Sequence, residues 1–189
     1  MVEEQIYNMK LISVLNEVLN IGSEERIHVS EDPIQDLRDL TAQNGVPSDN
    51  RPIGKPDGFW YAFGDSWLYF TSHSMTDKYE GSKHTYKVVV DKSKIISIRN
   101  QDMLDDFNNE FSFETDMRQF PYLIDWGKVS QRYSGFEIPC YDDINFQEIR
   151  RNRWLYLWDV PSGVIWNPDA VLKLKPLGNP KTLKQPRKN

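Results

Sequence analysis

Apolar residues in the first half of the chain recur with two different spacings. Residues 3–20 carry apolar side chains mostly at every third position, which predicts an N-terminal helix that ends at Gly22. Residues 33–40 fit one or two helical turns, whereas several Gly and Pro in residues 41–57 predict a loop. Alternating or short continuous apolar runs predict strands at residues 26–30, 58–63, 84–90 and 94–98.

The second half combines longer helical patterns with short strands. Residues 100–111 fit a helix with Asn100 as its N-cap, because the apolar side chains that follow lie on one side. Further helices are predicted at residues 120–133 and 143–151, and strands at residues 135–138, 154–158, 163–166 and 170–174. This order predicts an α+β fold with a split, mainly antiparallel sheet, flanking helices and the N-terminal helix.

Composition and charge fit one soluble domain with a distinct tail. The chain has 189 residues, 39% of them hydrophobic, and a formal net charge of −5. We expect a single domain over residues 1–175 and a flexible basic tail over residues 176–189. Six Lys and Arg but no Asp or Glu lie in residues 173–189, so the rest of the chain is more acidic than the net charge shows. This acidity argues against coating of nucleic acid by the whole surface.

The chain lacks the common signals for export, membrane insertion and metal binding. The only cysteine, Cys140, cannot form an internal disulfide, which is typical of a reducing compartment. No signal-peptide pattern opens the sequence, and no apolar run has the length that a membrane span requires. Three separated histidines and one cysteine predict no metal site. We therefore expect a cytoplasmic protein that binds neither membrane nor metal.

Three short clusters hold the residues that could carry chemistry. His28 and Ser30 are two residues apart on a predicted strand, so they share one face. Residues 55–63 join a loop to a strongly aromatic strand, and aromatic faces can stack on a planar cation. Asp159 lies between two segments rich in tryptophan. Each cluster taken alone also fits an ordinary role, as a half-buried strand, core packing or an exposed turn.

The order of these clusters resembles the ADP-ribosyltransferase fold, in its diphtheria-toxin and poly(ADP-ribose) polymerase branch. The segments IHVSEDPIQDL, GFWYAFGDSW and TYKVVVDKSKIISI also look like small phage ADP-ribosyltransferases, including anti-CRISPR examples. The resemblance covers about residues 26–98 and 135–174. It implies that the chain uses NAD as its substrate, without a metal, and transfers ADP-ribose to a macromolecule.

The resemblance assigns NAD contacts to two strands and the segment that follows. His28 matches the histidine that hydrogen-bonds a ribose of NAD, and Ser30, with Val29 between them, matches the serine of the same motif. Trp60 and Tyr61 fall at the aromatic positions near the nicotinamide. The remaining matches are Ser66 and Trp67, at the start of a short helix predicted to run through Phe70.

The catalytic acid is where the sequence departs from the family pattern. Ser162 stands at the position of the family's glutamate, and Asp159 is the nearest acid before it. Asp142 and Asp143 are reserve candidates. Loss of nicotinamide develops positive charge on the sugar, as in the oxocarbenium-like transition state of glycoside hydrolysis, and a carboxylate stabilises that charge whereas a serine cannot.

These matches imply a phage or bacterial effector or toxin with a protein or nucleic-acid acceptor. Arg150, Arg151 and Arg153, together with the basic tail, would favour an anionic acceptor. Two alternatives stay open. One is a binding or inhibitor protein that has kept the fold without the activity, and the other is an NAD glycohydrolase with water as the acceptor.

Overall fold

The computed structural model describes residues 22–35, 55–67, 70, 84–141, 144 and 150–178. Outside these ranges lie the predicted helix 3–20, most of the predicted turns 33–40, of the loop 41–57 and of the helix 143–151, residues 72–82, Asp142 and Asp143, and residues 179–189. The chain divides into two compact units. The first unit comprises Met1–Gln35, Tyr61–Val89 and Leu172–Asn189, and the second comprises Asp36–Trp60 and Val90–Val171.

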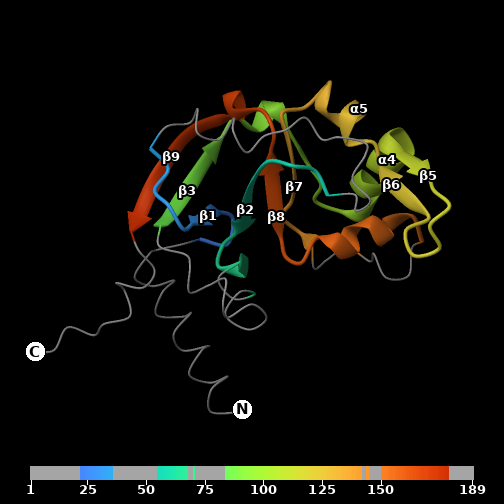
Figure 1. Ribbon diagram of the computed structural model, residues 1–189, viewed down its shortest axis with the longest axis horizontal. Coiled ribbons are helices and arrows are strands. Elements are labelled where there is room, and N and C mark those ends of the chain that lie inside the picture. The colour runs from blue at the N-terminus through green and yellow to red at the C-terminus, as the bar shows by residue number, and fades with distance from the viewer. Residues whose placement is uncertain are drawn as a thin grey trace, which may run out of the picture. The chain divides into compact units, whose positions relative to one another are not determined.

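The fold belongs to the α+β class, as predicted, with a mostly antiparallel sheet and few helices (Figure 1). Seven strands hydrogen-bond in the order β4-β7-β8-β2-β1-β3-β9. Their bounds are β1 Arg26–Ser30, β2 Phe59–Phe63, β3 His84–Val90, β4 Ile95–Ser97, β7 Gly135–Ile138, β8 Ser162–Ile165 and β9 Val171–Gly178. The predicted strands in these seven regions are confirmed, with ends that shift by up to a few residues.

In the first unit, β1 is the central strand. It pairs antiparallel with β2, where Arg26 lies opposite Phe63, and antiparallel with β3, where His28 lies opposite Tyr86. Ile27 is buried while the next three side chains of β1 are half-buried. The strand therefore presents polar groups at positions that solvent or a ligand can reach.

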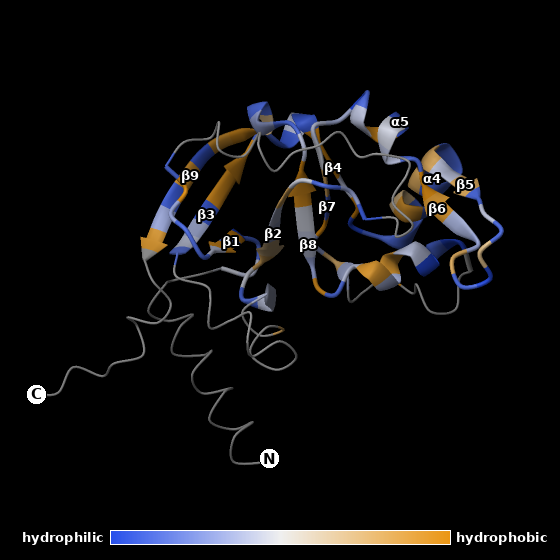
Figure 2. Ribbon diagram, in the orientation of Figure 1, coloured by the Kyte–Doolittle hydropathy of each residue, from blue (hydrophilic) through white to orange (hydrophobic). Residues whose placement is uncertain are grey.

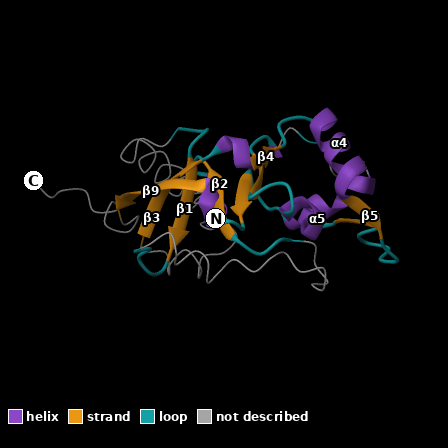
Figure 3. Ribbon diagram, turned by 90° about the horizontal axis from the view of Figure 1, so that it is seen from above, coloured by secondary structure: helices purple, strands orange, loops and turns teal. Residues whose placement is uncertain are grey.

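In the second unit, β7 pairs with β4 in parallel and with β8 antiparallel. Phe136 lies opposite Ile96 on β4 and opposite Val164 on β8. The remaining elements are α4 Gln101–Phe111, β5 Ser112–Glu114 and α5 Trp126–Ser130 (Figure 3), together with β6 Tyr122–Ile124 and the short 3₁₀ helices η2 Lys92–Lys94, η4 Arg150–Leu157 and η5 Pro168–Ala170. The predicted cap of α4 is confirmed, because the Asn100 side chain accepts a hydrogen bond of 2.9 Å from the Met103 amide.

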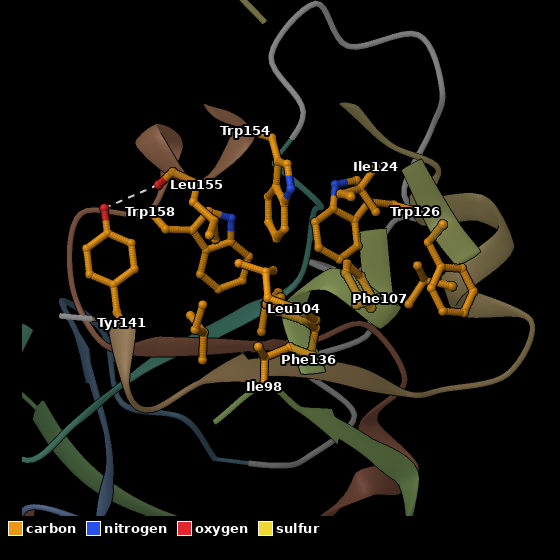
Figure 4. Close-up of a cluster of buried hydrophobic side chains, with 14 of the residues drawn as sticks. Ile98, Leu104, Phe107, Ile124, Trp126, Phe136, Tyr141, Trp154, Leu155 and Trp158 are labelled. Carbon is orange, nitrogen blue, oxygen red and sulfur yellow. Dashed lines mark hydrogen bonds between the residues drawn. The ribbon is translucent and has the colours of Figure 1, made fainter. Parts of the chain in front are cut away.

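Aromatic rings fill the core of the second unit (Figure 4). Phe136 is fully buried, and its ring centroid lies 5.1 Å from that of Phe107 and 5.0 Å from that of Trp158. The helix α4 shows both apolar and polar colours in Figure 2, since one side of it packs into this core. Asn108 of α4 is also buried and accepts a hydrogen bond of 2.9 Å from Trp154 Nε1. Its own amide donates to Asn152 Oδ1 at 2.6 Å, so the side chain of Asn108 is paired through both its oxygen and its nitrogen. Trp158 Nε1, in the same core, is buried without a hydrogen-bond partner among the described residues.

Two predicted elements of the second unit are wrong. Residues 120–133 form strand β6 and then helix α5, because Pro121 precedes the strand and the Asp125 side chain caps a new helix by accepting from the Lys128 amide. Residues 154–158 belong mainly to the 3₁₀ helix η4 rather than to a strand. Their burial follows a helical spacing, since Trp154, Leu155 and Trp158 are buried while Tyr156 is 48% exposed.

Candidate functional site

The first unit places the predicted NAD-ribose residues on one face of β1. His28 and Ser30 alternate along the strand with Val29, which therefore points to the other face. The His28 ring lies 6.5 Å from the ring of Tyr86 on β3, and both His28 and Ser30 are half-buried. Ser30 Oγ donates a hydrogen bond of 2.7 Å to the Asp32 carbonyl, which turns the chain away after the strand.

Tyr61 shares its side of β2 with Phe63 and lies beneath an arginine. The guanidinium of Arg26 lies 6.0 Å from the ring centroid of Tyr61 and 5.2 Å from that of Phe63. All three side chains are buried. Cation–π contacts of this kind hold a guanidinium against the ring faces. Arg26 was not among the predicted site residues, although it precedes His28 by two positions and so lies on the same face of β1.

Ser66 and Trp67 follow a tight turn after β2. Gly64 has a φ of 57°, a left-handed conformation that glycine adopts without the steric cost of a side chain. Its amide donates a hydrogen bond of 2.8 Å to the Glu25 carbonyl, so the turn is fixed next to β1. Residues 66, 67 and 70 are helical, and the Trp67 ring stacks on Phe70 with centroids 5.8 Å apart. This helical turn keeps Ser66 and Trp67 half-buried, within the first unit.

The second unit brings Trp60 and Asp159 together through a lysine. Lys55 Nζ lies 4.8 Å from the centroid of the Trp60 ring and 3.6 Å from Asp159 Oδ2. The Trp60 ring in turn packs against Trp158, with centroids 4.8 Å apart. Trp60 and Tyr61 are neighbours on a strand, so their rings point to opposite faces of β2. The structure therefore does not bring these two predicted aromatic contacts together.

Lys55 is an ammonium in a partly dehydrated position. Burial lowers its pKa below the ordinary value of 10.5, and the negative charge of Asp159 opposes this change. Its side chain is 35% exposed, and that of Asp159 is 39% exposed. The carboxylate thus remains open to solvent on one side. Lys55 belongs to the aromatic cluster at residues 55–63 identified from the sequence. Its contact with Asp159 could not be predicted, because the two residues lie far apart along the chain.

Glycine at position 58 allows the Lys55 segment to enter β2 against β8. A Cβ added at Gly58 would lie 2.6 Å from the Ile165 carbonyl oxygen and 2.7 Å from Val164 Cγ2. Its φ of 156° is also one that other residues rarely adopt. No larger side chain fits this approach, so the backbone that carries Lys55 is held close to the strand that follows Asp159.

Ser162, at the position of the family's glutamate, is a structural residue of β8. It is 6% exposed, and its Oγ donates a hydrogen bond of 2.8 Å to the Val160 carbonyl. This bond closes the turn that leads from Asp159 into the strand. Asp159 is therefore the acid that this turn presents to solvent, while Asp142 and Asp143 lie outside the described residues.

The arginines of η4 are partly engaged within the second unit. Arg151 donates a hydrogen bond of 2.7 Å to Asn109 Oδ1, and its guanidinium lies 5.3 Å from the Tyr122 ring centroid. Arg153 is half-buried. The side chain of Arg150 and most of the basic tail are not among the described residues. These contacts tie Arg151 to α4 and β6, in addition to any role with a partner.

The comparisons with known proteins give no relative. No family model, no curated protein and no solved structure matches the chain. Within the described ranges, no three His, Cys, Asp or Glu side chains are grouped as a metal site would need. The helices of those same ranges include none with the length and apolar character to cross a membrane.

Proposed function

We propose that the protein is an NAD-dependent ADP-ribosyltransferase with an ADP-ribosyltransferase-like split sheet. The observation that carries the proposal is the shared face of His28 and Ser30 on β1, with half-buried polar groups that a ribose could contact. The motif resemblance described above supplies the substrate. The mainly antiparallel sheet and the strand positions of the motifs support the fold assignment.

The proposed reaction breaks the bond between nicotinamide and C1′ of its ribose. Nicotinamide leaves with the bonding electrons, positive charge develops on the sugar, and a nucleophile of the acceptor attacks C1′ and releases its proton to water. The carboxylate of Asp159, partly exposed on its turn, would stabilise the charged sugar in the transition state. Within the first unit, His28 and Ser30 would hold ribose hydroxyls, and the half-buried Ser66 and Trp67 would add further contacts to NAD. Val29 points to the other face of β1 and Tyr61 is buried beneath Arg26, so the proposal assigns them no direct contact.

The acceptor in this proposal is a protein or a nucleic acid. Arg151 and Arg153 lie on the same 3₁₀ helix, and Arg150 and the basic tail add further positive charge in the sequence. Contacts to phosphates by such residues would make acceptor binding sensitive to salt. The resemblance to small phage enzymes favours a role as an effector or toxin in the cytoplasm of a host.

Incubation of the purified protein with labelled NAD and a host lysate tests the transferase activity. We expect labelled macromolecules with the wild type and a loss of about 100-fold or more in labelling rate with Asp159→Ala, because a positioned electrostatic group commonly contributes that much. Asp169→Ala is the matched control, since it removes another exposed carboxylate of the second unit. Separate protease and nuclease digestion then identifies the acceptor class. Full labelling by the Asp159 variant would contradict the assigned role.

A second candidate, a non-catalytic binding protein, is favoured by the Lys55–Asp159 ion pair. Lys55 offsets the negative charge that the transition state would need, and Ser162 is buried in an internal hydrogen bond. Thermal shifts with NAD on the wild type and His28→Ala distinguish the candidates, since a binding protein that has lost NAD would show no shift in either. Release of free ADP-ribose without a labelled macromolecule would instead identify an NAD glycohydrolase.

A further inference from the structure

Lys55 fills a position that combines two features of organic-cation sites. Its ammonium lies over the Trp60 ring, 4.8 Å from the centroid, and 3.6 Å from Asp159 Oδ2. An indole face attracts a cation through its quadrupole, and a carboxylate beside it adds charge attraction. Trp158 packs on Trp60 and is itself fully buried, so the indole that carries the cation is supported from the core.

We infer that Lys55 is an internal occupant of this site and leaves when a cationic aromatic ring of a ligand binds between Trp60 and Asp159. In the free protein the lysine would neutralise Asp159 and cover the indole. A positively charged pyridinium ring, as found in NAD, offers the same charge together with a flat face for stacking. The inference rests on the proposed function for its natural ligand, and it adds the residue that controls access.

Moving the Lys55 side chain away from Trp60 and Asp159 costs little free energy. Burial without full compensation lowers its pKa, which means that the protein holds the ammonium less favourably than water does. The ion pair with Asp159 is partly exposed on both sides, and such pairs contribute little to stability. Lys55 also lies three residues before Gly58, in a segment without helix or strand structure, so its side chain can turn outward while β2 stays in place.

The test measures binding of 1-methylnicotinamide, a pyridinium cation methylated on its ring nitrogen, and of neutral nicotinamide, by quenching of tryptophan fluorescence and by calorimetry. We expect Lys55→Met to tighten binding of the cation about fivefold or more and to change binding of neutral nicotinamide less than twofold. Lys55→Arg, which keeps a positive charge, should resemble the wild type. Lys92→Met is the matched control, because Lys92 is an exposed lysine of the same unit.

A second variant keeps the test decisive. Lys55→Gln repeats the neutralisation with a polar side chain, and circular dichroism checks that each variant is folded. Trp60→Leu combined with Lys55→Met should remove the gain, since the stacking face is gone. Unchanged, weaker or undetectable binding of the cation by both neutral variants would overturn the inference.

The outcome also separates this inference from the proposed function. Tighter pyridinium binding by Lys55→Met, with no transfer of label by any variant, would leave the inference standing and contradict the transferase. If an acceptor is labelled but pyridinium binding is the same with and without Lys55, the transferase proposal would stand and the inference about Lys55 would be contradicted. The binding assay needs neither an acceptor nor turnover, so the two results are independent.

Discussion

The fully buried rings of the second unit and the rings beside β1 in the first unit have different partners, although other rings of the second unit, such as Trp60 and Tyr122, also meet cations. In the second unit the rings of Phe136, Trp154 and Trp158 are fully buried and contact mainly one another (Figure 4). In the first unit the rings meet polar partners: Tyr86 lies beside His28, and Arg26 lies over Tyr61. In the first unit, hydrogen-bonding groups therefore lie next to aromatic faces, and recognition of a sugar or a charged ring uses groups of both kinds.

This difference separates rings that are enclosed in a core from rings that a ligand could reach. A close-packed aromatic core holds its members in place through many small contacts and leaves few groups for a ligand. Trp60 lies at the margin of that core, with Trp158 against its ring and the Lys55 ammonium over it. Such a residue can be fixed by the scaffold and still offer a face to a ligand. The comparison can be tested by substitutions that act on one unit at a time.

The largest effect is expected from Phe136→Ala in the core of the second unit. The ring is fully buried in the fold, and it contacts Phe107, Trp126 and Trp158. Its removal leaves a cavity, so the free energy of unfolding should fall by about 3–5 kcal/mol. Urea denaturation followed by tryptophan fluorescence measures the change.

Phe113→Ala is the control for that substitution. Phe113 lies on β5 and is 47% exposed, so we expect a loss within about 0.5 kcal/mol, as for most surface positions. Equal losses for the two variants would contradict a core that depends on close packing. A separate, unaffected transition in Phe136→Ala would indicate that the first unit unfolds on its own.

A smaller effect is expected from Tyr86→Phe in the first unit. The Tyr86 hydroxyl accepts a hydrogen bond of 2.9 Å from the Ile34 amide, which ties the segment after β1 to β3. Removing the hydroxyl keeps the ring beside His28 and should reduce the free energy of unfolding by about 1 kcal/mol. Tyr133→Phe is the control, because the Tyr133 carbonyl, which accepts from Trp166 Nε1, is retained. A larger loss than that of Phe136→Ala would reverse the comparison.

The sequence predicted those parts of the fold that depend on local patterns. The alternation in residues 84–90 and the Asn100 cap before a one-sided apolar helix both gave the observed elements. Residues 154–158 were predicted as a strand because they are almost all apolar, and a short apolar run does not distinguish strand from helix. Only their contacts with α4 and β7 settle the choice, and these come from distant parts of the chain.

The candidate site was predictable to a similar extent. The two-residue period placed His28 and Ser30 on one face of β1. The same period puts Trp60 and Tyr61 on opposite faces of β2, which the motif resemblance ignored. The contact of Lys55 with Asp159 depends on pairing of segments far apart in the sequence, so local spacing could not predict it.

The smallest effect is expected from Asp91→Asn, at an exposed cap of the second unit. The Asp91 carboxylate accepts hydrogen bonds from the Ser93 hydroxyl at 2.6 Å and from the Ser93 amide at 3.1 Å. These bonds, the hydroxyl first, lower the pKa of Asp91 below its ordinary value of 3.8. The folded state therefore favours the ionised form, and this contribution is complete above pH 3.8 and lost as the pH falls through the lowered pKa.

We thus expect Asp91→Asn to be slightly less stable than the wild type at neutral pH, with a difference that vanishes in acid. Denaturation midpoints measured from pH 7 down to about pH 2 give the comparison, since that range includes the ordinary pKa of aspartate and values below it. Asp116→Asn removes a charge from another exposed position and controls for net charge. A difference that persists unchanged into acid would mean that the cap acts through packing. In that case the Asp91 cap would stabilise the fold through packing and the Tyr86 hydroxyl through its hydrogen bond. The two contributions would then differ in their physical origin, and not only in their exposure to water.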